Sequence, residues 1–174
     1  MFKAKLLLIS FFLLSFFSVN LFSQDQFQPP KPLEIKVYDA MVGEWEGVSD
    51  MMGMKSNDKL KIYWTLNKQF LVMEMKSVGV DNPKNVFNAI CYYSVDKDGK
   101  SVSWWFDDWG TEMAMSGTGV ISDNKFTILS SNSMMKDDRT VEVNGSEMTV
   151  SGVTTWTQGG QEMKAESKTV FNKK

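Results

Sequence analysis

The segment Asp58-Lys-Leu-Lys-Ile-Tyr-Trp-Thr-Leu66 alternates apolar and polar side chains with a period of two residues. Leu60, Ile62 and Trp64 share one face of an extended chain, which Leu66 continues, and the lysines lie on the other face. This period is typical of a β-strand that buries one face and exposes the other. The segment therefore predicts one strand in the wall of a β-sheet core.

The same period continues in both directions, from Gly43 almost to the last residue. Further strands are predicted to open at Gly43 and to cover Leu71–Lys76, Val86–Val95, Ser101–Asp108, Glu112–Val120, Lys125–Ser131, Arg139–Val143, Glu147–Trp156 and Glu162–Phe171. Short turns separate them, such as Asn144-Gly145, a preferred pair for a tight hairpin. About nine or ten antiparallel strands joined in sequence order expose two long edges unless the sheet closes on itself. The predicted fold class is therefore all-β, a single antiparallel up-and-down β-barrel, with a β-sandwich as the alternative.

Residues 1–23 have the order of charge and hydrophobicity that is typical of a secretory signal peptide. Two lysines precede an uncharged apolar run over Leu6–Phe17, and a plausible processing region covers Ser18–Ser23. The apolar stretch is slightly short for a membrane-spanning helix, which is the alternative. We expect cleavage between Ser23 and Gln24 and export to the periplasm or the extracellular space, with no membrane span in the mature protein.

Two segments lie between the predicted signal peptide and the first strand. Residues 24–32 are polar and carry three of the four prolines, which predicts an extended leader. Residues 33–174 are predicted to form the barrel domain. This domain opens with a short helix, because Leu33, Val37, Tyr38 and Met41 recur at helical spacing.

The composition excludes several kinds of chemistry. The chain has no histidine, which rules out Ser-His-Asp and Cys-His catalysis, His-ligated haem and the usual zinc sites. Cys91 is the single cysteine, so no intrachain disulfide forms, and its apolar surroundings predict a buried small side chain rather than a nucleophile. Cleavage would remove two lysines and no acid, which takes the formal net charge from −2 to −4. An acidic domain of this kind disfavours nucleic-acid binding.

The alternation also predicts which side chains point into the barrel. Over Ser101–Asp108, Trp104 and Phe106 are expected to point inward, because the opposite face carries Ser103 and Asp107. Trp105 lies on that more polar face and is expected to point outward. Trp109 continues the same face, so the two tryptophans are predicted to form an exterior patch or a contact at the barrel mouth.

Several segments resemble a known family of small barrels. They are Met41-Val-Gly-Glu-Trp-Glu-Gly47, Leu66-Asn-Lys-Gln-Phe-Leu71, Phe87-Asn-Ala-Ile-Cys-Tyr-Tyr-Ser-Val-Asp96, Trp104-Trp-Phe-Asp-Asp108 and Met115-Ser-Gly-Thr-Gly119. The Gly-x-Trp opening resembles the start of lipocalin-like barrels, and the whole set is similar to an uncharacterised bacterial family of lipocalin-like (calycin-type) barrels, domain of unknown function 1579. The resemblance implies a barrel over roughly residues 40–171, with Trp45 packed across one end. It also suggests a ligand and supplies no catalytic residues.

Bulky side chains on the predicted inward faces are the candidate ligand-binding residues. They are Trp45, Trp64, Met73, Tyr93, Trp104, Phe106, Asp108 and Trp156. Such side chains either fill a packed core or line an apolar pocket. Asp108 shares the face of Trp104, where it is expected to bond a ligand or to cap the Trp109-Gly110 turn. The predicted function is binding of a small apolar ligand or of a partner at the rim, without catalysis and without a cofactor.

The methionines suggest a second function. Met51, Met52 and Met54 lie within one predicted turn, and thioethers suit Cu(I). The alternative is that methionines fill irregular gaps in the core. An enzyme built on Asp108 with Tyr93 or Tyr63 is a third possibility, which composition does not support.

Overall fold

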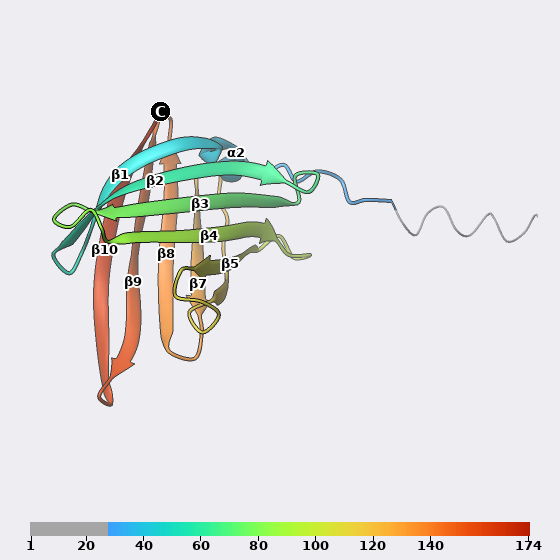
Figure 1. Ribbon diagram of the computed structural model, residues 1–174. Coiled ribbons are helices and arrows are strands. Elements are labelled where there is room, and N and C mark those ends of the chain that lie inside the picture. Colours follow the sequence, from blue (N-terminus) through green and yellow to red (C-terminus); the bar gives the residue numbers. More distant parts are fainter. Residues whose placement is uncertain (1–27) are drawn as a thin grey trace, which may run out of the picture. The chain divides into compact units, whose positions relative to one another are not determined.

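The computed structural model describes residues 28–174, so the predicted signal peptide and the first part of the predicted leader lie outside the described residues. The elements are α2 (Lys36–Met41), β1 (Gly43–Met51), β2 (Met54–Thr65), β3 (Phe70–Gly79), β4 (Val86–Val95), β5 (Ser101–Asp107), β6 (Met115–Gly119), β7 (Lys125–Ser131), β8 (Met135–Asn144), β9 (Glu147–Gln158) and β10 (Gln161–Lys173). Each strand pairs antiparallel with the next, and β1 pairs with β10 to close the barrel (Figure 1). The predicted all-β up-and-down barrel with a preceding short helix is confirmed.

The up-and-down order places alternate connections at the same end of the barrel. One end, which we call the helix end, carries α2 and the connections 66–69, 96–100, 120–124 and 145–146. The opposite end, which we call the loop end, carries the connections 52–53, 80–85, 108–114, 132–134 and 159–160. Within residues 28–174, α2 is the sole α-helix, and it is far too short to cross a membrane.

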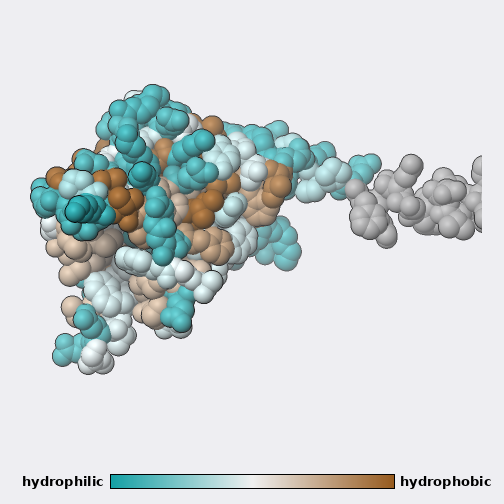
Figure 2. Space-filling model, viewed as in Figure 1, coloured by the Kyte–Doolittle hydropathy of each residue, from teal (hydrophilic) through white to brown (hydrophobic). Residues whose placement is uncertain are grey.

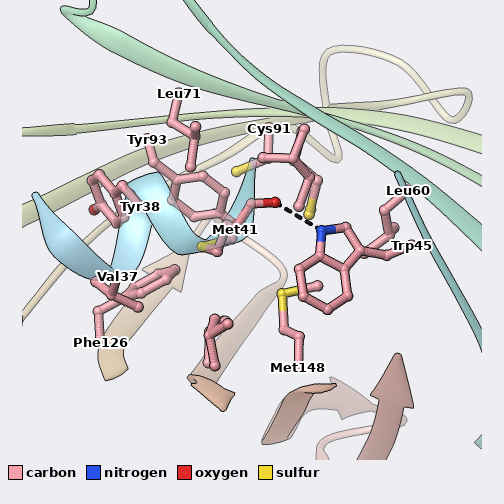
Figure 3. Packing of buried hydrophobic residues seen from close by; sticks show 14 of the residues in the cluster. Val37, Tyr38, Met41, Trp45, Leu60, Leu71, Cys91, Tyr93, Phe126 and Met148 are labelled. Carbon is pink, nitrogen blue, oxygen red and sulfur yellow. Dashed lines mark hydrogen bonds between the residues drawn. The ribbon is translucent and has the colours of Figure 1, made fainter. Parts of the chain in front are cut away.

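The short helix α2 is held by packing rather than by its own turns. Helices of this length are unstable alone in water. Val37, Tyr38 and Met41 share one face and are buried against the inside of the barrel (Figure 3). On the other side of α2, the Asp39 carboxylate accepts a 2.7 Å hydrogen bond from Trp64 Nε1 and pairs with Lys68 Nζ at 2.8 Å. The predicted helical spacing is confirmed from Val37 onward.

Trp45 closes the helix end of the barrel, as the resemblance implies. Its side chain is fully buried, and its Nε1–H donates a 2.7 Å hydrogen bond to the carbonyl oxygen of Met41 (Figure 3). The Lys173 ammonium lies 5.1 Å from the ring centroid and covers the ring from outside. The indole therefore ties β1, α2 and β10 together at one point.

Aromatic rings fill the space between α2 and the strands. Tyr38 meets Phe126 edge to face at 5.2 Å, and its hydroxyl lies 2.6 Å from Ser101 Oγ. Tyr93 contacts both rings, at 6.0 Å from Tyr38 and 5.3 Å from Phe126. This half of the interior is a packed core.

The prediction for β5 was wrong, because the two faces of that strand are exchanged. Register pairs Cys91 with Trp105 and Tyr93 with Ser103, and opposite residues of neighbouring strands point to the same side. Ser103 is buried, and Trp105 packs against the core. Trp104 and Phe106 instead point outward.

The outer face of β3 to β5 accounts for this exchange, because it is itself aromatic. Trp104 packs on Phe70 at 6.0 Å, and Phe106 meets Tyr92 at 6.5 Å. Trp104 is 38% and Phe106 is 44% exposed. On the face of the molecule in view, Figure 2 shows hydrophobic residues between hydrophilic ones. Apolar character therefore does not distinguish the inside from the outside of β5.

Several strand boundaries also differ from the prediction, since β8 begins at Met135 rather than at Arg139 and β3 extends beyond Lys76 to Gly79. β6 begins at Met115 rather than at Glu112, and its pairing with β7 covers only Ser116–Thr118. Leu66 is not part of the buried face of β2. It lies in a turn with φ of 48° and is exposed.

Cys91 is a buried free thiol in the core, as predicted, and burial raises its pKa to about 12 from an ordinary value of 9.0. Burial also raises the pKa of Tyr38 and of Tyr93. Because the pKa of the Cys91 thiol is higher in the folded state, the protonated thiol stabilises the fold fully below about pH 9. This stabilisation is lost as the pH rises toward 12.

We therefore expect the free energy of unfolding to fall above pH 9, by up to about 1.4 kcal/mol per pH unit for the thiol. Urea denaturation at pH 8 and pH 10.5 measures this loss. The Cys91→Ala variant should lose about 2 kcal/mol less over that interval. An equal loss of stability in the wild-type protein and in Cys91→Ala would mean that folding does not raise the pKa of the thiol.

Candidate functional site

A belt of polar side chains crosses the barrel interior between the packed core and the loop end. We define this polar belt as Ser49, Ser56, Asp58, Ser103, Ser130, Asp137, Arg139, Thr154, Ser167 and Thr169. All of them lie on inward faces, because register pairs them with one another or with core residues. In residues 28–174 no buried side-chain nitrogen or oxygen lacks a hydrogen-bond partner. The belt is a satisfied network rather than a set of isolated polar groups.

On one side of the belt, hydroxyl groups surround a buried carboxylate. Asp58 is 1% exposed and accepts hydrogen bonds from Ser49 Oγ and, at 2.8 Å, from Ser56 Oγ. Ser49 Oγ also lies 2.8 Å from Thr169 Oγ1, which joins β1 and β2 to β10. Neutral donors therefore stabilise this charge.

On the other side of the belt, an arginine and an aspartate form a bidentate salt bridge. Arg139 donates from Nε and Nη2 to the two Asp137 oxygens at 2.7 and 2.9 Å, and from Nη1 to Ser167 Oγ at 3.1 Å. Thr154 Oγ1 lies 2.6 Å from the same carboxylate. Gly152 lies opposite Arg139 in register, and a Cβ there would be 3.0 Å from Arg139 Cδ. A Cβ there would overlap the Asp138 carbonyl oxygen as well, so both the backbone of β8 and the arginine side chain favour glycine at this position.

Beyond the belt, aromatic and thioether side chains surround the loop end. We define this loop-end ring as Phe87, Trp105, Met115, Met135, Trp156 and Met163. Register places Trp105 beside Met115, and Trp156 between Met135 and Met163. All six side chains point inward, yet all remain partly exposed. Solvent reaches part of each of these side chains, whereas the core beyond the belt is packed.

Most of the predicted ligand residues lie elsewhere. Trp45, Met73 and Tyr93 are buried in the core, and Trp64 packs beside it at the helix end, which agrees with the packed-core alternative. Of the eight candidates, Trp156 is the one that lies in the loop-end ring.

Asp108 is not in the barrel interior. Its carboxylate is exposed and accepts hydrogen bonds from the backbone N–H and side-chain Nδ2 of Asn88, at 2.7 and 2.9 Å. The neighbouring Asp107 caps the following turn instead, by accepting a 2.9 Å hydrogen bond from the Trp109 backbone N–H. The predicted inward placements of Trp104, Phe106 and Asp108 were therefore wrong.

The sequence analysis placed Trp105 with Trp109 in an exterior patch or at the barrel mouth, and the loop end agrees with the second alternative. It did not name Trp105, Asp107 or Arg139 as ligand-binding residues. A signal for Trp105 and Asp107 was present, because the Asp96-Lys-Asp-Gly99 turn joins β4 to β5. Counting pairs outward from that turn brings Trp105 opposite Cys91. Arg139 carried no comparable signal, because a charged residue in a strand normally faces solvent.

The methionine turn lies at the loop end. Met51, Met52 and Met54 are 40%, 64% and 70% exposed at the β1–β2 hairpin, where Met52 and Gly53 both have positive φ. In the part of the chain that the structure describes, no group of three or more His, Cys, Asp or Glu side chains is placed to hold a metal ion. Thioether ligation of Cu(I) at this hairpin stays a prediction.

A shallow groove runs along the outside of β1 to β4 between charged side chains. Lys174 and Lys59 pair with Glu46 at 2.6 and 3.1 Å, and their hydrogen bonds lower the pKa of that carboxyl. Tyr63 donates a 2.7 Å hydrogen bond to Glu74. Two carboxylates at this groove, Glu46 and Glu74, therefore already have hydrogen-bond partners.

No protein-family model and no curated protein sequence matches the chain. Among solved structures, the barrel is similar to the S-type phycobiliprotein lyase CPES from Guillardia theta, with a TM-score of 0.59 and 11% identity over 79% of this chain and 90% of that chain. The fold is a lipocalin-like β-barrel. A redesigned β-barrel is also similar, at 8% identity and a TM-score of 0.39 over 80% of this chain and 96% of that chain.

Proposed function

We propose that the loop end of this barrel binds a small apolar ligand without chemical turnover. The observation that carries the proposal is the loop-end ring, in which large apolar side chains point inward and remain partly exposed. Sites for small molecules are typically concave and apolar with a few placed polar groups, which the belt supplies beneath the ring. That a similar barrel belongs to a phycobiliprotein lyase agrees with a small-ligand role.

We also propose that the protein acts after export from the cytoplasm. The charged, apolar and small-residue order of residues 1–23 supports export before the barrel folds. The segments that resemble the uncharacterised lipocalin-like family support membership in it.

Two neighbouring tryptophans provide a matched test. The probe is N-phenyl-1-naphthylamine, a neutral apolar fluorophore whose emission rises in an apolar site. We expect the mature protein to bind it, and Trp105→Leu to weaken binding by about fivefold or more, because an inward ring is lost. Trp104→Leu should leave the affinity unchanged, because that ring lies outside.

Melting temperatures of both variants show whether they fold. Equal effects of the two substitutions would contradict a site at the loop end. Absence of binding by the wild-type protein would contradict the proposed function itself.

Cu(I) binding stays the alternative function. The exposed thioethers of Met51, Met52 and Met54 at one hairpin favour it. Competition with a Cu(I) chelator reports on this alternative independently of the fluorescent probe.

A further inference from the structure

One side of the loop-end ring combines three aromatic rings with a carboxylate. The Phe87 ring lies 6.5 Å from Trp105, nearly parallel at 22°, and 5.3 Å from Trp109 at 57°. Phe87 comes from β4, Trp105 and Asp107 from β5, and Trp109 from the loop that follows. We call these four residues the aromatic box.

The carboxylate of Asp107 is fixed in this box by two neutral donors. Trp105 Nε1 donates to Oδ2 and the Trp109 backbone N–H donates to Oδ1, both at 2.9 Å. Because each oxygen is held, the carboxylate cannot turn away from the rings.

The charge of Asp107 has no cationic partner among the described residues. Ion pairs in residues 28–174 include Asp137 with Arg139, but none of them involves Asp107. Asp107 is partly buried at the loop end, and Trp109 beside it is 69% exposed. A negative charge is thus held at the edge of the Trp105 indole, beside Trp109, whose ring solvent reaches.

We propose that the aromatic box binds the organic ammonium group of the ligand, with a methylated or quaternary nitrogen. Ring faces attract a cation within about 6 Å of the centroid, and recognition of quaternary ammonium groups uses such rings. A metal ion would require several oxygen ligands, whereas the box offers one carboxylate. The inference rests on the proposed function, because the apolar body of the same ligand lies on the rest of the loop-end ring.

The aromatic box should distinguish ligands by the charge of their head group. A neutral head gains nothing from Asp107 beyond ordinary contact with the rings. An anionic head is repelled by the carboxylate at short range. An ammonium head gains from both the carboxylate and the rings.

Three probes with one apolar tail test this discrimination. Dodecyltrimethylammonium, dodecyl maltoside and dodecyl sulfate are titrated below their micelle concentrations, and the change in tryptophan fluorescence measures each dissociation constant. We expect the ammonium probe to bind about tenfold tighter than the sulfate probe, with the maltoside between them.

Asp107→Asn should weaken the ammonium probe by about fivefold or more and leave the maltoside unchanged. This variant keeps an oxygen acceptor in nearly the same shape, and unchanged maltoside binding shows that it folds. Asp108→Asn is the matched control, because it removes the same charge one residue away, outside the box.

The outcomes separate the two proposals. Equal affinity for the three probes, or an unchanged ammonium affinity in Asp107→Asn, would overturn the ammonium inference and leave an apolar site in place. Failure of all three probes to bind would overturn the proposed function and the inference together.

Discussion

Replacing Trp45 by alanine is expected to lower the free energy of unfolding by about 3–5 kcal/mol, since a large side chain is removed from a fully packed place. The indole is fully buried, and its hydrogen bond to the Met41 carbonyl is lost with it. The helix end would then lose the contact that joins β1 to α2. Urea denaturation followed by circular dichroism measures the change.

Trp104→Ala is the matched control, because it removes a side chain of the same kind from the outer face of the barrel. Trp104 is 38% exposed and packs chiefly on Phe70. We expect its loss to cost about 2 kcal/mol, less than the loss of Trp45, since more than a third of the residue is already in water. A cost for Trp104→Ala equal to that of Trp45→Ala would contradict the assignment of inner and outer faces.

Replacing Arg139 by methionine is expected to lower the free energy of unfolding by about 2–4 kcal/mol. The guanidinium makes both of its short contacts to Asp137, whose side chain is 11% exposed. Without the arginine, Asp137 keeps a buried charge that the Thr154 hydroxyl alone cannot compensate. The arginine side chain is itself 29% exposed, which places the expected cost below that of a fully enclosed pair.

A second substitution separates charge from packing. The double variant Arg139→Met with Asp137→Asn removes both charges and should recover about 1–2 kcal/mol relative to Arg139→Met. Additive costs in the two single variants would mean that the pair is not coupled.

The barrel itself could be predicted from sequence, because most strands bury one apolar face. Over Leu60–Trp64 of β2 and along β4 the inward residues are apolar and their neighbours are more polar or more exposed, so alternation identifies the inside correctly. In β5 both faces carry aromatic residues, so alternation shows two faces without showing which is buried. Pairing with β4 settles that question, and pairing is a property of the folded sheet.

The candidate site was harder to predict, for a related reason. The polar belt takes one or two residues from each of several strands, and some of these strands lie far apart in the sequence, as β1 with Ser49 and β10 with Thr169 do. Each residue alone resembles an ordinary polar position of a strand, and closure of the barrel brings them together. Large aromatic residues drew the prediction to the helix end, where Trp45 and Tyr93 serve packing.

The shortest strand of the barrel is β6, which covers Met115–Gly119. Its ladder with β7 covers only Ser116–Thr118, and Met115 at its start belongs to the loop-end ring. Local opening begins where few backbone hydrogen bonds must break. We therefore expect amide hydrogen exchange to be faster along β6 than along β8, whose ladder with β9 runs over Met135–Asn144.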